Sequence, residues 1–182
     1  MTAQGNVRQL VDRLNTHFSE VVEAVHSEEG TVDKFIGDAA LAVFGAPIEK
    51  SSSTNALAAV RTAIELQRRL DDLNHAWAAE GHSPWKQVVI LSYGSVVSGN
   101  IGSTSRMDYT VIGDAVNMAS RLETIAKQCD QGIVMSAAVA KHLPGDWPLL
   151  DLGTFPIRGQ GEQRVFALQT DTNKDTHPAI DQ

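Results

Sequence analysis

The sequence has a single cysteine, fewer basic than acidic residues and no long run of apolar residues. Cys129 has no partner for an internal disulfide, so a reducing compartment is the default expectation. The net charge of -7 argues against a nucleic-acid binder or a protein held on anionic lipid, although local cations can still bind a small anionic ligand. The first residues show no signal-peptide pattern, and no apolar stretch approaches the length of a membrane span. These absences together predict a soluble, cytoplasmic protein.

The length and composition suit one folded domain. The 182 residues, 42% hydrophobic and 20% charged, are enough for one sizeable core and too few for two. We expect residues 1–169 to form this domain. From residue 170 onward the sequence becomes polar, and residues 170–182 are expected to be a loose tail.

Two long stretches carry apolar residues at the three- and four-residue spacing of one helix face. The first predicts a helix over Val7–Val25, followed by a stop at which Gly30 suits a left-handed C-terminal position. The second predicts a helix that begins with Ser53 or Thr54 as its N-cap and runs to about Ala79. Both helices are expected to pack one face on the core.

Between these helices, two β-rich runs over residues 31–36 and 39–44 flank the pair Gly37-Asp38. A glycine and an aspartate between such runs favour a tight turn, so we predict a hairpin with Asp38 at its tip. Lys34 lies four residues before Asp38. Taken alone, the two would be a solvated lysine and an ordinary turn residue; the alternative is that they are two parts of one site.

The second half of the chain alternates short strands and helices. Gly99 and Gly102 are expected to bracket a loop, and Asp114 begins a helical pattern that continues through Lys127. Ser136 is expected to cap a small helix. The expected strands cover residues 86–93, 106–112, 133–135, 149–157 and 164–168.

This order of elements predicts an α+β fold with most of a ferredoxin-like β-α-β-β-α-β unit and some additions. The opening strand of that unit has no counterpart in the sequence. In such a sheet it is an interior strand, and each backbone group left buried and unpaired without it would cost about 1–3 kcal/mol. We therefore expect the chain to be incomplete at its start.

Two segments resemble one enzyme family. The first runs from Gly30 to Ala39, Gly-Thr-Val-Asp-Lys-Phe-Ile-Gly-Asp-Ala, and continues to Phe-Gly-Ala-Pro at residues 44–47. The second comprises Gly-Asn-Ile-Gly-Ser at residues 99–103 and Arg-Met-Asp-Tyr-Thr-Val-Ile-Gly-Asp-Ala-Val-Asn-Met-Ala-Ser-Arg-Leu-Glu at residues 106–123. Both resemble the catalytic domain of class III adenylyl and guanylyl cyclases, in that family's order and spacing. The resemblance covers residues from about Val7 to Leu168.

The resemblance implies a homodimer with two sites across its interface, which converts ATP or GTP to the 3′,5′-cyclic nucleotide and pyrophosphate. The ribose 3′-oxygen attacks the α-phosphorus in line, with two Mg²⁺ or Mn²⁺ ions. Asp38 corresponds to one of the family's two metal-binding aspartates. Asn117 and Arg121, four residues apart on one helix face, correspond to the residues that orient the ribose and stabilise phosphate charge. Arg158 occupies the place of a triphosphate-binding lysine.

Lys34 and Asp108 correspond to the family's base-reading pair, supplied by the subunit opposite the one that supplies Asp38. Adenine offers a ring-nitrogen acceptor and an amino donor, which a lysine donor and an aspartate acceptor complement. Guanine presents the reverse pattern at these two positions. The resemblance therefore implies ATP as the favoured substrate.

The sequence departs from the family at its start. The family's first metal aspartate lies on the opening strand, in a Phe-x-Asp-Ile-like segment that this sequence lacks. One strand and one metal ligand are missing together, and our hypothesis is that the chain as given has little or no cyclase activity. The alternative is a cyclase-like module that binds nucleotide or a partner domain without turnover. An unrelated ferredoxin-like binding domain would leave the shared motifs as coincidence.

Overall fold

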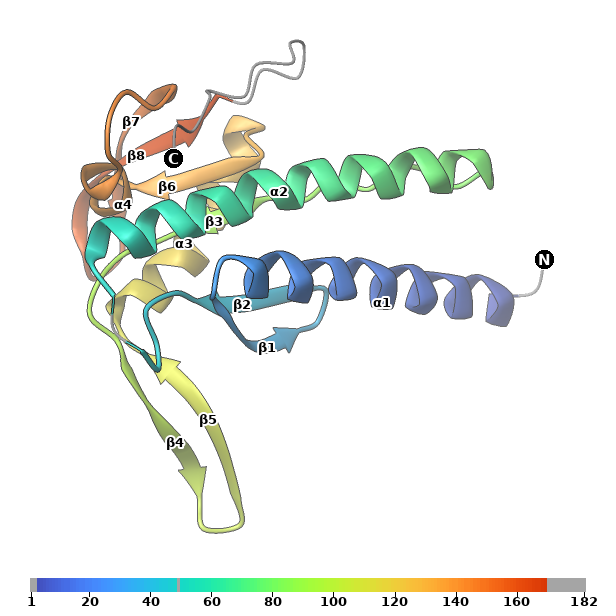
Figure 1. Ribbon diagram of the computed structural model, residues 1–182, viewed down its shortest axis with the longest axis horizontal. Helices are drawn as coiled ribbons and strands as arrows, with labels where there is room; N and C mark the ends of the chain where they lie inside the picture. Colours follow the sequence, from blue (N-terminus) through green and yellow to red (C-terminus); the bar gives the residue numbers. More distant parts are fainter. Residues whose placement is uncertain (1–2, 49, 170–182) are drawn as a thin grey trace.

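The computed structural model describes residues 3–48 and 50–169, which form the α+β fold that the sequence predicts (Figure 1). The helices are α1 (Ala3–Ser27), α2 (Ser52–Ala79), α3 (Asp114–Cys129) and α4 (Ala137–His142). The strands are β1 (Thr31–Ile36), β2 (Ala39–Val43), β3 (Val89–Leu91), β4 (Val97–Ser103), β5 (Arg106–Ile112), β6 (Ile133–Ser136), β7 (Leu149–Ile157) and β8 (Gly161–Leu168). Among the described helices, none combines the length and the apolar character that crossing a bilayer requires. The expected tail, residues 170–182, lies outside the described residues.

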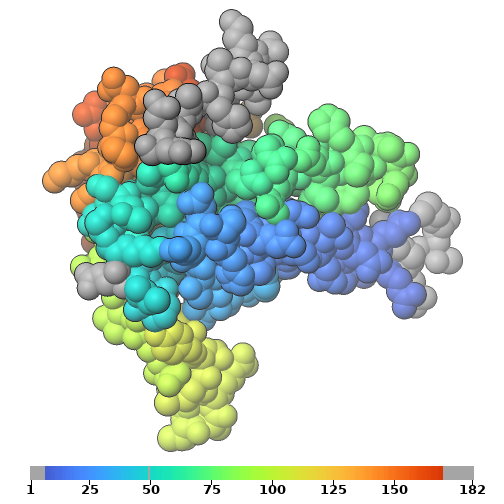
Figure 2. Space-filling model, in the orientation of Figure 1, coloured from blue at the N-terminus to red at the C-terminus, as the bar shows by residue number. Residues whose placement is uncertain are grey.

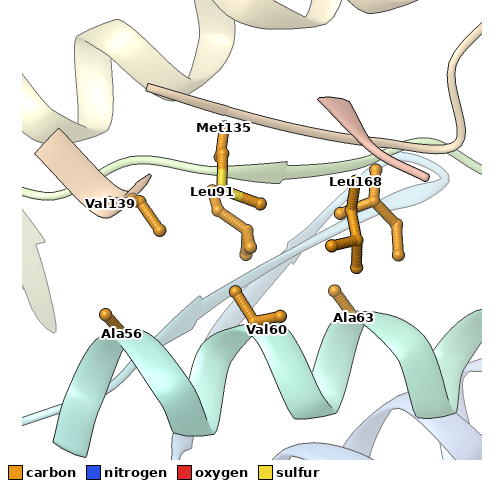
Figure 3. Close-up of a cluster of buried hydrophobic side chains, with 8 residues drawn as sticks. Ala56, Val60, Ala63, Leu91, Met135, Val139 and Leu168 are labelled. Atoms are coloured by element: carbon orange, nitrogen blue, oxygen red, sulfur yellow. The ribbon is translucent and has the colours of Figure 1, made fainter. Parts of the chain in front are cut away.

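A four-stranded sheet with the order β3-β6-β8-β7 forms the body of the molecule. β3 runs parallel to β6, and β8 runs antiparallel to both β6 and β7. Met135 packs in the cluster that α2 covers, and its neighbour Val134 packs in the cluster that α3 covers. Because successive side chains of a strand point to opposite faces, the two helices cover opposite faces of the sheet. In the first cluster, Ala56, Val60 and Ala63 of α2 face Leu91, Met135, Val139 and Leu168 (Figure 3).

The long helix α1 lies alongside α2 (Figure 1). Near its C-terminal end, α1 buries side chains in a third apolar cluster with α2 and the β1–β2 hairpin. Further along, the guanidinium of Arg13 lies over the rings of Trp77 and Trp85, 4.2 Å and 4.5 Å from their centroids. Its Nη2 also donates a hydrogen bond to the Ser83 carbonyl at 2.9 Å. These contacts dock the N-terminal half of α1 on α2 and on the segment that follows it.

Two hairpins lie outside the four-stranded sheet. The predicted β1–β2 hairpin is confirmed: Ile36 pairs with Ala39 across Gly37-Asp38. Gly37 has a φ of 64°, which suits a two-residue hairpin turn with glycine at its first position. The β4–β5 hairpin, residues 97–112, projects from the body, and we call it the arm (Figures 1 and 2).

The described strands thus form three separate sheets. In a β-α-β-β-α-β unit the opening strand is interior and pairs on both sides. In the part of the chain that the structure describes, β3 pairs with β6 alone. No described strand pairs with both β3 and the β1–β2 hairpin.

The loop expected between Gly99 and Gly102 is a wrong prediction. Gly99 and Gly102 do not bracket a loop, because both lie in β4 and pair with Thr110 and Met107 of β5. A Cβ at Gly102 would lie 2.1 Å from the Arg106 carbonyl oxygen, so this glycine permits close strand approach and marks no turn.

The end of α1 also differs from expectation. Glu29, and not Gly30, adopts the left-handed conformation, with a φ of 58°. Gly30 is buried, and a Cβ there would lie 2.6 Å from the ring of Phe44. Its small size therefore serves packing of the hairpin against α1.

Two further boundaries shift. The N-cap of α2 is Ser51, whose side chain accepts a hydrogen bond from the Thr54 backbone N–H. The predicted cap at Ser53 or Thr54 is therefore wrong by two or three residues. The predicted strand over residues 86–93 contracts to Val89–Leu91.

Candidate functional site

The structure brings together the strands that carry Lys34 and Asp108. Lys34 lies on β1 and Asp108 on β5, and these two strands contact each other. The hydroxyl of Thr110 donates a hydrogen bond to Oδ2 of Asp33 at 2.8 Å. Asp33 precedes Lys34, and Thr110 lies on the same face of β5 as Asp108 because the two are separated by one residue. A direct side-chain link therefore joins the two strands beside the candidate residues.

Both candidate base-reading groups are open to solvent. The side chain of Lys34 is 36% exposed, and its Nζ lies 3.7 Å from Oδ2 of Asp33. The side chain of Asp108 is 57% exposed, and its Oδ2 lies 3.9 Å from Nε of Arg106. The exposed Arg106–Asp108 pair contributes little to stability, so Asp108 is available to a ligand. Lys34 pairs with a largely buried carboxylate and still presents part of its side chain to solvent.

The helix α3 carries Asn117 and Arg121 one turn apart. Asn117 is exposed and Arg121 is half-buried. The helix begins directly after Gly113, at which a Cβ would lie 2.6 Å from the Ser95 carbonyl oxygen. Glycine at this position therefore lets the arm end and α3 begin close against the segment that precedes β4.

Arg158 lies in the turn between β7 and β8, and this turn packs against α3. Nε2 of Gln160 donates a hydrogen bond to the Asp114 carbonyl at 2.9 Å. A Cβ at Gly159 would lie 4.0 Å from Nη1 of Arg121. The structure thus places the guanidinium of Arg121 beside the turn that holds Arg158, so that two permanent cations lie in one region.

Asp38 lies on a different element from Arg121 and Arg158. It occupies the exposed turn of the β1–β2 hairpin. The pKa of Lys127, near the end of α3, is raised mainly by a hydrogen bond to Glu123, with a smaller contribution from the charge of Asp38. Asn117 is ten residues before Lys127, about 15 Å along the helix. Within one protomer, the charge of Asp38 therefore acts on the C-terminal end of α3, whereas Asn117 lies near the start of this helix.

The described residues of one protomer do not fit a two-ion metal centre. Over residues 3–48 and 50–169, no group of three or more His, Cys, Asp or Glu residues is arranged to hold a metal. Asp38 offers one carboxylate, and divalent cations such as Mg²⁺ are held in proteins by several oxygen ligands.

Sequence reasoning missed Asp33 and Thr110. Their hydrogen bond joins residues 77 positions apart, and the side chain of Asp33 is only 6% exposed. The available signal was an aspartate inside a β-rich run, because aspartate is depleted in strands.

A shallow hollow of about 370 Å³ between α1 and α2 is lined by none of the candidate residues. Its lining includes Arg68, Arg69 and Glu20, and the nearby Glu65 accepts hydrogen bonds from both arginines. These bonds, led by that of Arg68, lower the pKa of Glu65 to about 2. This cluster joins the two helices and lies apart from the candidate site.

The fold and the motifs are those of a nucleotide cyclase domain. The family model described as "Adenylate and Guanylate cyclase catalytic domain" matches residues 1–170. The chain belongs to this family, which confirms the resemblance seen in the sequence. Cyclase domains of this family are generally metal-dependent, bind a nucleotide substrate and commonly dimerise.

Individual relatives are adenylate cyclases by name. Adenylate cyclase 1 of Rhizobium meliloti (strain 1021) is 31% identical over 152 residues, which cover 84% of this chain and 23% of the relative. Adenylate cyclase of Anabaena cylindrica is 35% identical over 134 residues, which cover 71% of this chain and 25% of the relative. The chain thus spans about a quarter of the length of these relatives.

A solved adenylyl cyclase structure is also similar to this chain. The crystal structure of the adenylyl cyclase CyaB from P. aeruginosa matches with a TM-score of 0.80 and 27% identity. The match covers 97% of this chain and 88% of that chain. The likeness therefore extends over nearly the whole chain and is not confined to the motifs.

Proposed function

We propose that this domain binds ATP and, as a homodimer, forms 3′,5′-cyclic AMP and pyrophosphate. The observation that carries the proposal is the contact between β1 and β5, the strands that carry Lys34 and Asp108. The lysine donates to the ring nitrogen of adenine, and the aspartate accepts from its amino group. A guanine base would leave both groups mismatched, and sites of this kind reject such analogues strongly.

The cations of the site act on the phosphates. Arg121 lies beside the turn that holds Arg158, so both guanidinium groups can meet one triphosphate. Asn117 is one turn earlier on α3 and orients the ribose. The 3′-oxygen forms a bond to the α-phosphorus and loses its proton, while the bond from the α-phosphorus to the pyrophosphate oxygen breaks. Arg121 stabilises the charge that develops on the phosphate oxygens, because its own charge is permanent.

A second copy completes the site in this proposal. The arm carries apolar side chains that are exposed in the single protomer, with Met107 61% exposed and Tyr109 60% exposed. Large exposed apolar groups of this kind are typical of protein interfaces. In the dimer, Asp38 of one protomer serves the same site as Lys34, Asp108, Asn117 and Arg121 of the other. Asp38 supplies one carboxylate for a divalent cation, Mg²⁺ or Mn²⁺.

The alternative function is nucleotide binding without turnover. The observation that favours it is the single carboxylate of Asp38, since the described residues of one protomer hold no three-residue metal cluster. The hypothesis that this chain has little or no cyclase activity belongs to this alternative, and it stays a prediction.

Two measurements on the 182-residue chain test the proposal. The first is the Kd of ATP and of GTP, by competition against a fluorescent ATP analogue. We expect a preference for ATP that is lost in Lys34→Ala and Asp108→Ala and kept in the control Lys141→Ala, which changes an exposed lysine of α4. Equal affinity for ATP and GTP in the unmodified chain would contradict the base-reading roles.

The second measurement is cyclic AMP formation with Mn²⁺ or Mg²⁺ present. Turnover that falls by about a hundredfold or more in Arg121→Ala, with ATP binding retained, supports the enzyme. ATP binding with no turnover in the unmodified chain supports the silent module.

A further inference from the structure

One face of α1 brings a histidine into an aromatic cluster. The ring of His17 meets the ring of Trp85 edge to face, with the ring centroids 6.3 Å apart and the ring planes at 87°. Trp85 packs in turn on Trp77 of α2, with the centroids 4.9 Å apart. Aromatic pairs at these separations stabilise a contact beyond the area that they bury. His17 thus helps to dock α1 on α2 and on the segment that follows α2, residues 80–88.

The imidazole of His17 lies where its protonated form is unfavourable. Its Nδ1 is shielded from solvent and has no hydrogen-bond partner within residues 3–48 and 50–169. A protonated ring carries an N–H at both nitrogens, so protonation leaves a buried donor of a charged group without an acceptor. The guanidinium of Arg13, one turn earlier on α1, lies over the rings of Trp77 and Trp85, and like charges at this spacing repel each other. The docked cluster therefore favours the neutral imidazole.

Three elements bring charged groups to this part of the molecule. On α1, the charge of Glu20 raises the pKa of His17, but burial lowers that pKa more. On α2, Nη1 of Arg69 lies 2.6 Å from Oε2 of Glu20, so the charge of this glutamate is already compensated. Further charged groups of α2 and of residues 80–88 have partners of their own: Arg68 with Asp72, Glu80 with His82, and Lys86 with Asp130. The pKa of His17 therefore stays below 6.5 while α1 is docked.

The two halves of α1 are held differently. From Phe18 onward the helix buries apolar side chains against α2 and the β1–β2 hairpin, and Phe18 itself stacks on Phe35 of β1 with the centroids 4.1 Å apart. In the N-terminal half, large apolar side chains are exposed instead: Val7, Leu10 and Val11. The N-terminal half therefore depends mainly on Arg13 and His17 for its docking.

We propose that protonation of His17 releases the N-terminal half of α1 from α2 while the rest of the domain stays folded. Above pH 6.5 the imidazole is neutral and fits the docked cluster. As the pH falls below 6.5, the released half takes up a proton that the docked half excludes, so the equilibrium shifts towards release. The fold thus contains a pH-sensitive helix, outside the proposed nucleotide site and independent of it.

The size of the effect follows from the pKa of the released histidine. A solvated imidazole has a pKa of about 6.5, so at about pH 5.5 it is about ten times more often protonated than neutral. Docking should therefore weaken by up to about tenfold between about pH 7.5 and about pH 5.5.

Hydrogen exchange followed by mass spectrometry on the 182-residue chain tests the inference. Protection factors, corrected for the intrinsic pH dependence of exchange, report the local opening of each helix. We expect the protection of amides in residues 7–16 to fall by up to about tenfold from about pH 7.5 to about pH 5.5, and that of α3 to stay constant. His17→Phe keeps an aromatic ring that cannot take up a proton, and it should abolish the fall. His26→Phe, at an exposed histidine of the same helix, is the matched control and should keep the fall.

Three results would overturn the inference. They are protection in residues 7–16 that does not change with pH, a fall that persists in His17→Phe, and an equal fall in α3, which would indicate global unfolding. If His17→Phe does not fold, an NMR titration of the His17 ring in the unmodified chain decides. A pKa below 6.5 together with the expected fall in protection supports the inference, and a pKa at or above 6.5 overturns it.

Discussion

The four-stranded sheet and the arm are built on opposite principles. All four residues of β6 are buried, between helices on both faces. Of residues 97–112 in the arm, only Thr110 and Val111 are buried, and several large apolar side chains face solvent. These exposed side chains are Val97, Met107, Tyr109 and Ile112.

The burial that stabilises the sheet is thus separate from the candidate base-reading residues, which lie outside it, whereas Asn117, Arg121 and Arg158 lie on the body. The sheet holds itself together by burial within one chain. The arm, which carries Asp108, is held mainly by its own strand pairing and by the Asp33–Thr110 link. The β1–β2 hairpin, which carries Lys34 and Asp38, also packs against α1 and α2. Substitutions in the two regions should therefore change different measured quantities.

The largest expected effect is a core deletion in the body. Leu122 of α3 is 0% exposed, and we expect Leu122→Ala to lower the free energy of unfolding by about 2–5 kcal/mol, because the lost contacts leave a cavity. Urea denaturation measures it. Met107→Ala in the arm, where the side chain is 61% exposed, should change the same quantity by less than about 0.5 kcal/mol. Equal losses in the two variants would break the contrast between the regions.

The second effect concerns self-association. Tyr109→Lys places a charge on the exposed apolar surface of the arm, and we expect it to weaken the homodimer by about tenfold or more in Kd while unfolding is unchanged. Sedimentation equilibrium measures the Kd. Leu150→Lys, at an apolar residue of β7 that is 38% exposed, is the control and should leave the Kd unchanged. An unmodified chain that stays monomeric at high concentration with ATP would contradict the proposed dimer.

The β1–β2 hairpin could be predicted from neighbouring residues, whereas contacts between residues far apart in the sequence could not. Gly37-Asp38 forms its turn as expected because two adjacent residues decide a two-residue loop. The role of Gly30 is decided by Phe44, and the place of Gly102 in β4 is decided by its closeness to Arg106 across the hairpin. The spacing of residues along the sequence reveals neither of these contacts.

The candidate site follows the same division. The motifs supplied the candidate residues Lys34, Asp108, Asn117, Arg121 and Arg158, together with Asp38. No periodicity relates Asp33 to Thr110, because their contact depends on how β1 and β5 meet in space. The six site roles stay predictions, and the measurements above test those of Lys34, Asp108 and Arg121.

A third, smaller effect concerns the surface of the body, where ion pairs join α1 and α2. The pKa of Glu65 is lowered from 4.5 to about 2, mainly by its hydrogen bond to Arg68. A depressed carboxyl pKa contributes stability that is present above about pH 4.5 and is lost as pH falls towards 2. Glu65→Gln should therefore cost up to about 1 kcal/mol at pH 7 and progressively less below pH 4.5.

Urea denaturation between pH 7 and pH 3 measures this difference, with Glu162→Gln, an exposed glutamate of β8, as the control. A difference that stays constant across this range would show that ionisation of Glu65 is irrelevant to it.

The smallest expected effect concerns His17. Burial lowers its pKa below 6.5, and the charge of Glu20 opposes this shift only in part. The unfolded chain therefore takes up a proton more readily than the folded one, and the free energy of unfolding falls as pH drops through 6.5. His17→Gln should flatten this slope between pH 7.5 and 5.5, while His26→Gln, at an exposed histidine, should not. Equal slopes in all three proteins would contradict the assignment.

The guanidinium of Arg13, which lies over the rings of Trp77 and Trp85, gives this molecule an intrinsic fluorescence probe. Two of its 3 tryptophans lie against Arg13, and the remaining one, Trp147, packs near α4 on the apolar cluster beneath α2. Indole emission depends on its immediate surroundings, so detachment of α1 would alter the fluorescence of one pair while Trp147 reports on the sheet. Undocking of a single helix can therefore be watched in real time without attaching a dye.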